Sequence, residues 1–204
     1  MVPLITNIKK FVANKTPPAY LPYAVEHVRE AVCEITPVDH VTLNEVPIKS
    51  NSVIGKFELF ERETAPYSGM QLCADIYYAG DLNYCWQRFV ITKELCQCVF
   101  DDQDARVTTE EQIDQLVDVL RVPITSAGYS AWLPSAASEN FALFAALEIL
   151  CPIEDRLKLA PAYNSTELSA AELAEWFRIP AGYIQAVFEP SFIQVSTRIF
   201  QRNE

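Results

Sequence analysis

Long apolar runs and basic clusters are both missing from this chain. Its 204 residues contain no stretch of about 18 consecutive apolar side chains, so no membrane-spanning helix is predicted. Acidic side chains outnumber basic ones by 27 to 16, and the net charge is -11. No segregated basic face offsets this charge, and a phosphate backbone would repel the chain. We therefore expect neither a membrane nor a nucleic acid as a partner.

A signal peptide and a disulfide framework are missing as well. Lys9, Lys10 and Lys15 interrupt the N-terminal segment where a signal peptide would be continuously apolar. The six cysteines have no regular spacing, so we expect reduced, mostly buried thiols in a cytoplasmic protein. Cys96 and Cys98 would point about 200° apart on a helix, which prevents them from sharing one metal ion. No metal and no cofactor are therefore predicted.

Apolar residues recur with helical and strand periods, and they predict an α+β fold in a single domain over residues 1–204. An N-terminal arm (1–18) precedes a part with a leading helix, a small antiparallel sheet and a second helix (19–100). A mostly helical half follows (101–204). Helices are predicted at 5–12, 20–35, 86–100, 108–120, 140–151, 169–177 and 183–188, strands at 41–47, 53–60 and 70–78, a turn at 61–69 and a loop at 123–137.

Three segments carry a resemblance to a known family. Residues 87–100 are Gln-Arg-Phe-Val-Ile-Thr-Lys-Glu-Leu-Cys-Gln-Cys-Val-Phe. They resemble the pattern Arg-Phe-Thr-Leu-Ala-His-Glu-Leu-Gly-His on the zinc-binding helix of the ImmA/IrrE metallopeptidases. Residues 144–152, Phe-Ala-Ala-Leu-Glu-Ile-Leu-Cys-Pro, are similar to that family's later Glu-Ala-Asn-x-Phe-Ala-x-x-Leu-Leu-Met-Pro helix. Residues 172–180, Glu-Leu-Ala-Glu-Trp-Phe-Arg-Ile-Pro, resemble its closing Leu-Ala-x-x-Phe-x-Val-Ser turn. The resemblance spans residues 20–190 and implies a zincin-like fold.

The zinc ligands that the resemblance implies are replaced in this chain. The family holds its metal ion with two histidines four residues apart, because that spacing puts both imidazoles on one helix face. Lys93 and Gln97 occupy these two positions, and neither side chain is a good zinc ligand. The family's third ligand, a glutamate on the later helix, aligns with Phe141 or with Asn140. Glu139 is the nearest carboxylate.

Glu94 matches the family's general base, but a base without a metal-bound water has nothing to deprotonate. The resemblance therefore implies an inactive zinc site in which Lys93, Glu94, Gln97 and Glu139 are vestigial. We expect the Lys93 ammonium to take over part of the metal's charge by pairing with Glu139 across the two helices. Adjacent residues on a helix do not face each other, so a pair between Lys93 and Glu94 is not expected.

The resemblance also implies a functional setting, because the family acts on repressor-like proteins in bacterial, phage and mobile-element regulation. The first hypothesis is a non-catalytic regulator of prophage or mobile-element origin that keeps the binding groove and binds another protein. The alternative is an active hydrolase with a site rebuilt around Glu94 from Cys96, Cys98, His27 or His40. A structural or assembly scaffold is the third possibility.

Two further segments have a functional and a structural interpretation. The predicted helix pair in residues 169–188 has the spacing of a helix-turn-helix, but residues 182–188 contain no lysine or arginine. A DNA-reading helix needs such cations, so packing is the better explanation. Trp132, Leu133 and Pro134 form either a protein-binding patch beside the site or a loop packed onto the core.

Overall fold

The structure is a computed structural model that describes residues 2–16, 22–47, 49, 54–63, 69–99 and 134–200. The predicted helix at 108–120 and the aromatic segment at 132–133 lie outside the described residues. In chain order the elements are α1 (Val2–Lys15), α2 (Val25–Ile35), β1 (His40–Val46), β2 (Gly55–Glu63), β3 (Met70–Ala79), α3 (Tyr84–Val99), α5 (Pro134–Leu150), α6 (Ile153–Asn164), α7 (Ala170–Phe177), the 3₁₀ turn η2 (Ala181–Tyr183), α8 (Ile184–Phe188) and α9 (Pro190–Phe200). The predicted α+β class is confirmed.

The small sheet is mixed, with its three strands in the order β1-β3-β2. β2 runs antiparallel to β3 with Phe57 opposite Ile76, whereas β1 runs parallel to β3 with Leu43 opposite the same residue. The prediction of an antiparallel sheet is therefore wrong. The physical reason lies in β3, the most buried strand, whose Cys73, Ala74 and Ile76 are almost inaccessible to solvent. A central position pairs both of its edges and covers these residues, so β1 joins β3 rather than its sequence neighbour β2.

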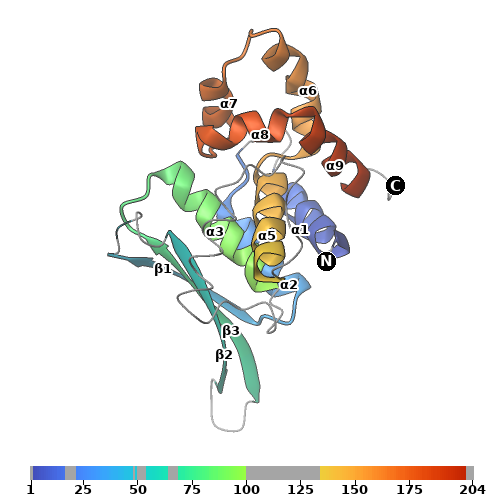
Figure 1. Cartoon of the computed structure of the whole chain (residues 1–204). Coiled ribbons are helices and arrows are strands. Elements are labelled where there is room, and N and C mark those ends of the chain that lie inside the picture. The colour runs from blue at the N-terminus through green and yellow to red at the C-terminus, as the bar shows by residue number, and fades with distance from the viewer. Residues whose placement is uncertain are drawn as a thin grey trace.

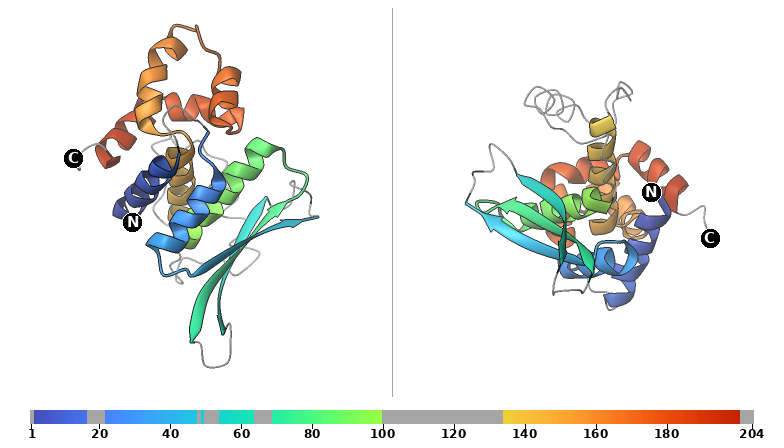
Figure 2. Two further views of the ribbon diagram at one scale, coloured as in Figure 1. Left: turned by 180° about the vertical axis from the view of Figure 1, so that it is seen from behind. Right: turned by 90° about the horizontal axis from the view of Figure 1, so that it is seen from below.

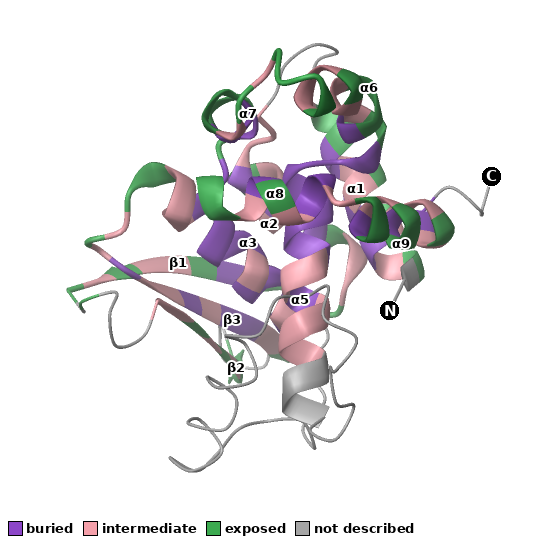
Figure 3. Ribbon diagram, turned by 45° about the horizontal axis from the view of Figure 1, so that its top comes forward, coloured by how far each residue is buried: buried purple, intermediate pink, exposed green. Residues whose placement is uncertain are grey.

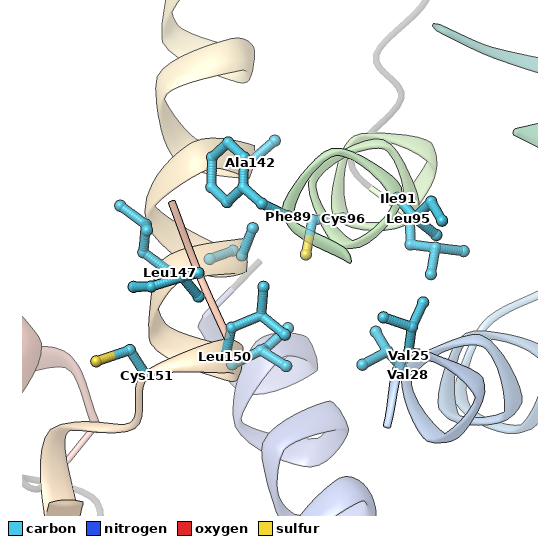
Figure 4. Packing of buried hydrophobic residues seen from close by; sticks show 14 of the residues in the cluster. Val25, Val28, Phe89, Ile91, Leu95, Cys96, Ala142, Leu147, Leu150 and Cys151 are labelled. Carbon is cyan, nitrogen blue, oxygen red and sulfur yellow. The ribbon is translucent and has the colours of Figure 1, made fainter. Parts of the chain in front are cut away.

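Helix α3 lies against the sheet and also forms the centre of the helical part (Figures 1 and 2). It contacts β2 and β3 on one side and α2 and α5 on others. Figure 4 shows Phe89 and Leu95 of α3 in the cluster that also contains Leu147 and Leu150 of α5. Buried residues are concentrated on α3 and on the half of α5 nearest α8, as Figure 3 shows. The core thus extends from the sheet into the C-terminal helices.

Several element boundaries differ from the predictions. The helix expected at 20–35 begins at Val25, and β2 continues through Glu63 into the predicted turn. Helix α5 begins at Pro134, inside the predicted loop, in keeping with proline's preference for the first helical turn. The N-terminal segment 1–18 contains α1, whose Ile5 and Ile8 are fully buried. The predictions missed helices α6 and α9 altogether.

Helix α7 follows its sequence signals closely. The Ser169 hydroxyl accepts a hydrogen bond from the Glu172 N–H at 3.2 Å, and the Glu172 carboxylate accepts one from the Ser169 N–H at 2.8 Å. This reciprocal pair forms a capping box at the helix start. Arg178 ends the helix in the left-handed conformation, with φ of 52°.

No helix among the described residues is long and apolar enough to cross a membrane.

A buried charge network connects the C-terminal helices. Glu148 on α5 and Arg156 on α6 are both 0% exposed, and they form an ion pair. Lys9 of α1 donates to the other oxygen of Glu148 at 2.6 Å. Arg156 also donates to the backbone carbonyl oxygens of Cys151 at 2.8 Å and Val187 at 2.9 Å. The buried Arg156 guanidinium therefore binds acceptors on α5, just after α5 and on α8, and these acceptors satisfy its own N–H donors.

We predict that replacing Arg156 by methionine destabilises the protein by about 3–5 kcal/mol, because the variant loses this network and one of the Glu148 charge partners. The free energy of unfolding, measured by urea denaturation, tests this. Lys158→Met on the same helix is the matched control, since Lys158 is an exposed cation that pairs with Asp155 at the surface and its loss should change stability little. Equal effects of the two substitutions would contradict a special role for the buried cation.

Candidate functional site

Four polar side chains from two helices meet at one side of the core. Lys93, Glu94 and Gln97 come from α3, and Glu139 comes from α5. The Lys93 ammonium lies 2.8 Å from Glu94 Oε1 and 2.8 Å from Glu139 Oε2. It also donates to Gln97 Oε1 at 3.3 Å, and the Gln97 amide donates to Glu139 Oε1. The ammonium is thus shared by two carboxylates and an amide, and we call these four residues the lysine site.

The predicted pairing of Lys93 with Glu139 is confirmed, but its exclusion of Glu94 is wrong. Neighbouring helical residues do diverge at Cβ, yet the lysine side chain has four methylene groups, and its ammonium returns to the Glu94 carboxylate. The structure also selects among the residues considered for the third ligand position. Glu139 reaches the lysine site, whereas Asn140 has a buried Oδ1 without a hydrogen-bond partner among the described residues.

The site is almost closed to water. The side chains of Lys93, Glu94 and Glu139 are 15%, 3% and 13% exposed. Burial alone would lower the pKa of Lys93, but the nearby Glu94 and Glu139 carboxylates outweigh it and raise that pKa above its usual value. Burial raises the pKa of Glu94, the Lys93 charge opposes this effect, and Glu139 adds to it. The charged Lys93 therefore offsets the free-energy cost of burying the ionised Glu94 carboxylate.

The first residue of β2 forms one wall of the lysine site. A Cβ added to Gly55 would lie 2.4 Å from Val90 Cγ1 and 3.0 Å from Glu94 Oε1, so only glycine lets the strand approach α3 this closely. Gly55 also lines a largely apolar hollow of about 320 Å³ at the end of the sheet. The other lining residues are Val46, Ile54, Lys56, Glu58, Tyr77, Tyr78 and Ala79. Gly55 therefore lies beside both the lysine site and this hollow.

Aromatic rings lie near the lysine site on α3 and η2. Tyr183 packs on Phe89, with their ring centroids 4.5 Å apart, and Trp86 contacts both rings edge-on at 5.9 Å. Burial raises the pKa of Tyr183, and the nearby positive charge of Lys93 acts in the opposite direction. These rings help to keep the ammonium away from bulk water, which strengthens its interaction with the carboxylates.

The residues considered for a rebuilt hydrolase site are not assembled around Glu94. Burial raises the pKa of the Cys96 thiol, which keeps it protonated and unreactive, and Cys98 is buried as well. His27 lies on α2 with Nδ1 3.4 Å from the Thr16 hydroxyl, and His40 is an exposed residue at the start of β1. Across the described ranges, no group of three or more His, Cys, Asp or Glu residues is arranged to hold a metal ion.

Glu94 is poorly placed to act as a base. Its Oε1 already accepts a hydrogen bond from Lys93, and the residue is 2% exposed. A general base must reach the proton that it removes, either directly or through one water molecule. The lysine site is therefore arranged to hold two helices together and not to activate a water molecule.

Sequence reasoning missed two contributors to the site, Gly55 and Tyr183. A signal existed for Gly55, because an isolated glycine at the start of a strand often marks a close backbone approach. Nothing local marks Tyr183, since its place beside α3 depends on how the C-terminal helices fold back.

Comparisons of the chain with protein-family models, with curated proteins and with solved structures found no match.

We predict that Lys93→Met destabilises the protein at neutral pH by about 3–5 kcal/mol, because two carboxylates then stay buried without their cation. In this variant the folded-state pKa of Glu94, already raised by burial and no longer lowered by the Lys93 charge, should exceed its unfolded value. Protonation at low pH then stabilises the fold, and this contribution is lost as pH rises through the folded-state pKa. The deficit relative to the unsubstituted chain should therefore be smaller at pH 5 than at pH 8 in urea denaturation.

Unchanged or increased stability of the Lys93→Met variant would contradict the role of the lysine as an internal counterion. Lys56→Met is a matched control, because that lysine pairs with Glu58 on the surface, with side chains 61% and 47% exposed. Its loss should change stability little at either pH.

Proposed function

We propose that this chain is a non-catalytic, zincin-like relative of the ImmA/IrrE metallopeptidases that acts by binding another protein. The Lys93 ammonium, shared between Glu94 and Glu139, is the observation that carries the proposal. In the ImmA/IrrE metallopeptidases, a metal ion is bound by the helix that residues 87–100 resemble. In this chain the Lys93 ammonium lies between the corresponding helices, α3 and α5. The fold is kept and the metal chemistry is lost.

The placement of Glu139 supports the relation to a zinc site. Lys93 and Gln97 are four residues apart, so they lie on one face of α3 and correspond to the two metal-binding positions of the motif. Both side chains contact Glu139 on α5, one or two residues before the position that aligns with the third ligand of the motif. The two residues selected by the sequence pattern thus meet the carboxylate nearest to the third ligand position, 42 positions beyond Gln97 in the chain.

The hollow beside Gly55 supports protein binding. Gly55, whose Cβ direction leads to Glu94, is one of its lining residues, and most of the others, Ile54 and Tyr77 among them, lie on the face of the sheet away from α3. A partly apolar hollow with a few polar groups suits an apolar side chain of another protein. We infer that this place corresponds to the retained binding groove, and that the partner is a regulatory protein of a prophage or mobile element. No comparable observation favours a hydrolase or an assembly scaffold.

Restoring the motif tests the relation to the metallopeptidases. We predict that the double substitution Lys93→His/Gln97→His binds about one zinc ion per chain, because two imidazoles and Glu139 then form a three-ligand zinc site. Zinc content by elemental analysis and the affinity by competition with a chromophoric chelator give the readout. Adding Glu139→Gln to the double variant should weaken zinc binding on the order of tenfold or more, because one ligand is lost.

Two results would oppose the proposal. Zinc binding that is unaffected by Glu139→Gln would show that the helices are not arranged around a former metal site. A folded double variant with no zinc at all would show the same. Circular dichroism of each variant establishes that it is folded before its zinc content is interpreted.

The protein-binding part has a separate test. We predict that Tyr77→Ala, which removes one ring from the hollow, reduces retention of a partner at least several-fold in affinity capture followed by mass spectrometry. Trp176→Ala is the matched control, because Trp176 is a 53% exposed aromatic residue on α7 that does not line the hollow. A partner retained equally by both variants, or no specific partner for the unsubstituted chain, would contradict binding at this place.

A further inference from the structure

β2 forms one margin of the sheet and has a second edge that no described strand pairs with. In the strand order β1-β3-β2 it contacts only β3 among the strands. The hairpin of β2 and β3 extends beyond the helices, so this margin is not covered by any labelled helix in Figure 1. An exposed strand edge offers unpaired N–H and C=O groups to another strand.

One hydrogen bond fixes which residues of β2 point their backbone groups outward. The Ala79 N–H donates to the Ile54 carbonyl at 3.2 Å, and these two residues are opposite each other in the register that continues along the hairpin. In an antiparallel ladder, hydrogen-bonded pairs alternate with non-hydrogen-bonded pairs. The even-numbered residues of β2 therefore bond to β3, whereas Phe57, Leu59 and Glu61 direct their N–H and C=O groups to the free edge.

The odd-numbered and even-numbered side chains of β2 also face different surroundings. The Cβ direction of Gly55 leads into α3, so the odd-numbered residues face the helices. The even-numbered residues Lys56, Glu58, Phe60 and Arg62 lie on the other face and are all exposed. Along this face an anion and a cation flank an aromatic ring at equal spacing, two residues on either side of Phe60.

We propose that the free edge of β2 binds β2 of a second copy of this chain, antiparallel and with its two-fold axis at Phe60. In this register Glu58 of each copy lies opposite Arg62 of the other, and the two Phe60 rings meet in a non-hydrogen-bonded pair, where side chains are closest. Leu59 and Glu61 then exchange the hydrogen bonds that face outward. The pairing gives Arg62 an anionic partner, adds a second cation to Glu58, which already pairs with Lys56, and satisfies backbone groups of the edge.

Neighbouring registers are worse. An axis at Glu58 places two carboxylates opposite each other, and an axis at Leu59 places Lys56 opposite Arg62. An axis at Glu61 opposes two carboxylates on the face toward the helices. Like charges directly opposite each other destabilise a strand pair. The same charges that discourage other pairings thus specify one self-complementary register, which is why a second copy, and not an unrelated strand, is the occupant.

The charge pattern is tested by sedimentation velocity of the full chain over a range of concentrations at low salt. We expect a reversible monomer–dimer equilibrium. Glu58→Arg or Arg62→Glu alone should raise the dissociation constant on the order of tenfold, because two cross-strand pairs become repulsive. The double variant Glu58→Arg/Arg62→Glu should restore dimerisation. A monomer at all concentrations, or a double variant that is as weak as the single ones, would overturn the proposal.

Cross-linking tests the register independently. Phe60→Cys should give a disulfide-linked dimer under mild oxidation, because opposed residues of a non-hydrogen-bonded pair have Cα atoms about 4.5 Å apart, within disulfide range. Lys56→Cys is the matched control on the same face, since its two copies would be eight positions out of register, about 27 Å apart. Equal cross-linking of the two variants, or none above that of the unsubstituted chain, would overturn the register.

Discussion

The ammonium of Lys93 lies 2.8 Å from the carboxylate of the next residue on α3 and 2.8 Å from the carboxylate of Glu139 on α5. Either carboxylate alone would be costly to bury, and so would the ammonium. Together they hold two helices that belong to different halves of the chain. The start of β2 also approaches this site, because a Cβ on Gly55 would lie 3.0 Å from Glu94 Oε1. One internal cation thus joins α3 to α5 close to the start of β2, beside the apolar contacts of α3 with both.

Local signals predicted much of the fold. Helix α2 has an amphipathic period, and helix α7 begins with a serine–glutamate cap. Both signals involve residues that are close together in the sequence, so they can be recognised without knowing the rest of the fold. The parallel pairing of β1 with β3 could not be read in this way, because strand order depends on which strand the helices bury. Helices α6 and α9 were missed. Pro161 lies inside α6, where a proline removes a helical hydrogen bond, and Pro190 is the first residue of α9.

The polar sites were predictable to different degrees. Motif spacing placed Lys93 and Gln97 on one face of α3, and the expected pairing of Lys93 with Glu139, the carboxylate nearest to the third ligand position, is confirmed. It could not describe how far the lysine side chain bends, and the contact with Glu94 was therefore excluded in error. The pair of Glu148 and Arg156 was overlooked, although a carboxylate inside an apolar helix always needs a partner. The sequence marked that need but not the partner, which lies on the next helix.

Metal content tests the central claim most directly. The full chain, purified without chelator and without a metal-affinity tag, is examined by elemental analysis. If the lysine ammonium has taken the place of a metal ion, zinc will be far below one equivalent per chain, and added zinc will neither be retained nor raise the melting temperature. About one tightly held zinc ion per chain would contradict the account, because Lys93, Glu94, Gln97 and Glu139 as arranged here leave no place for it.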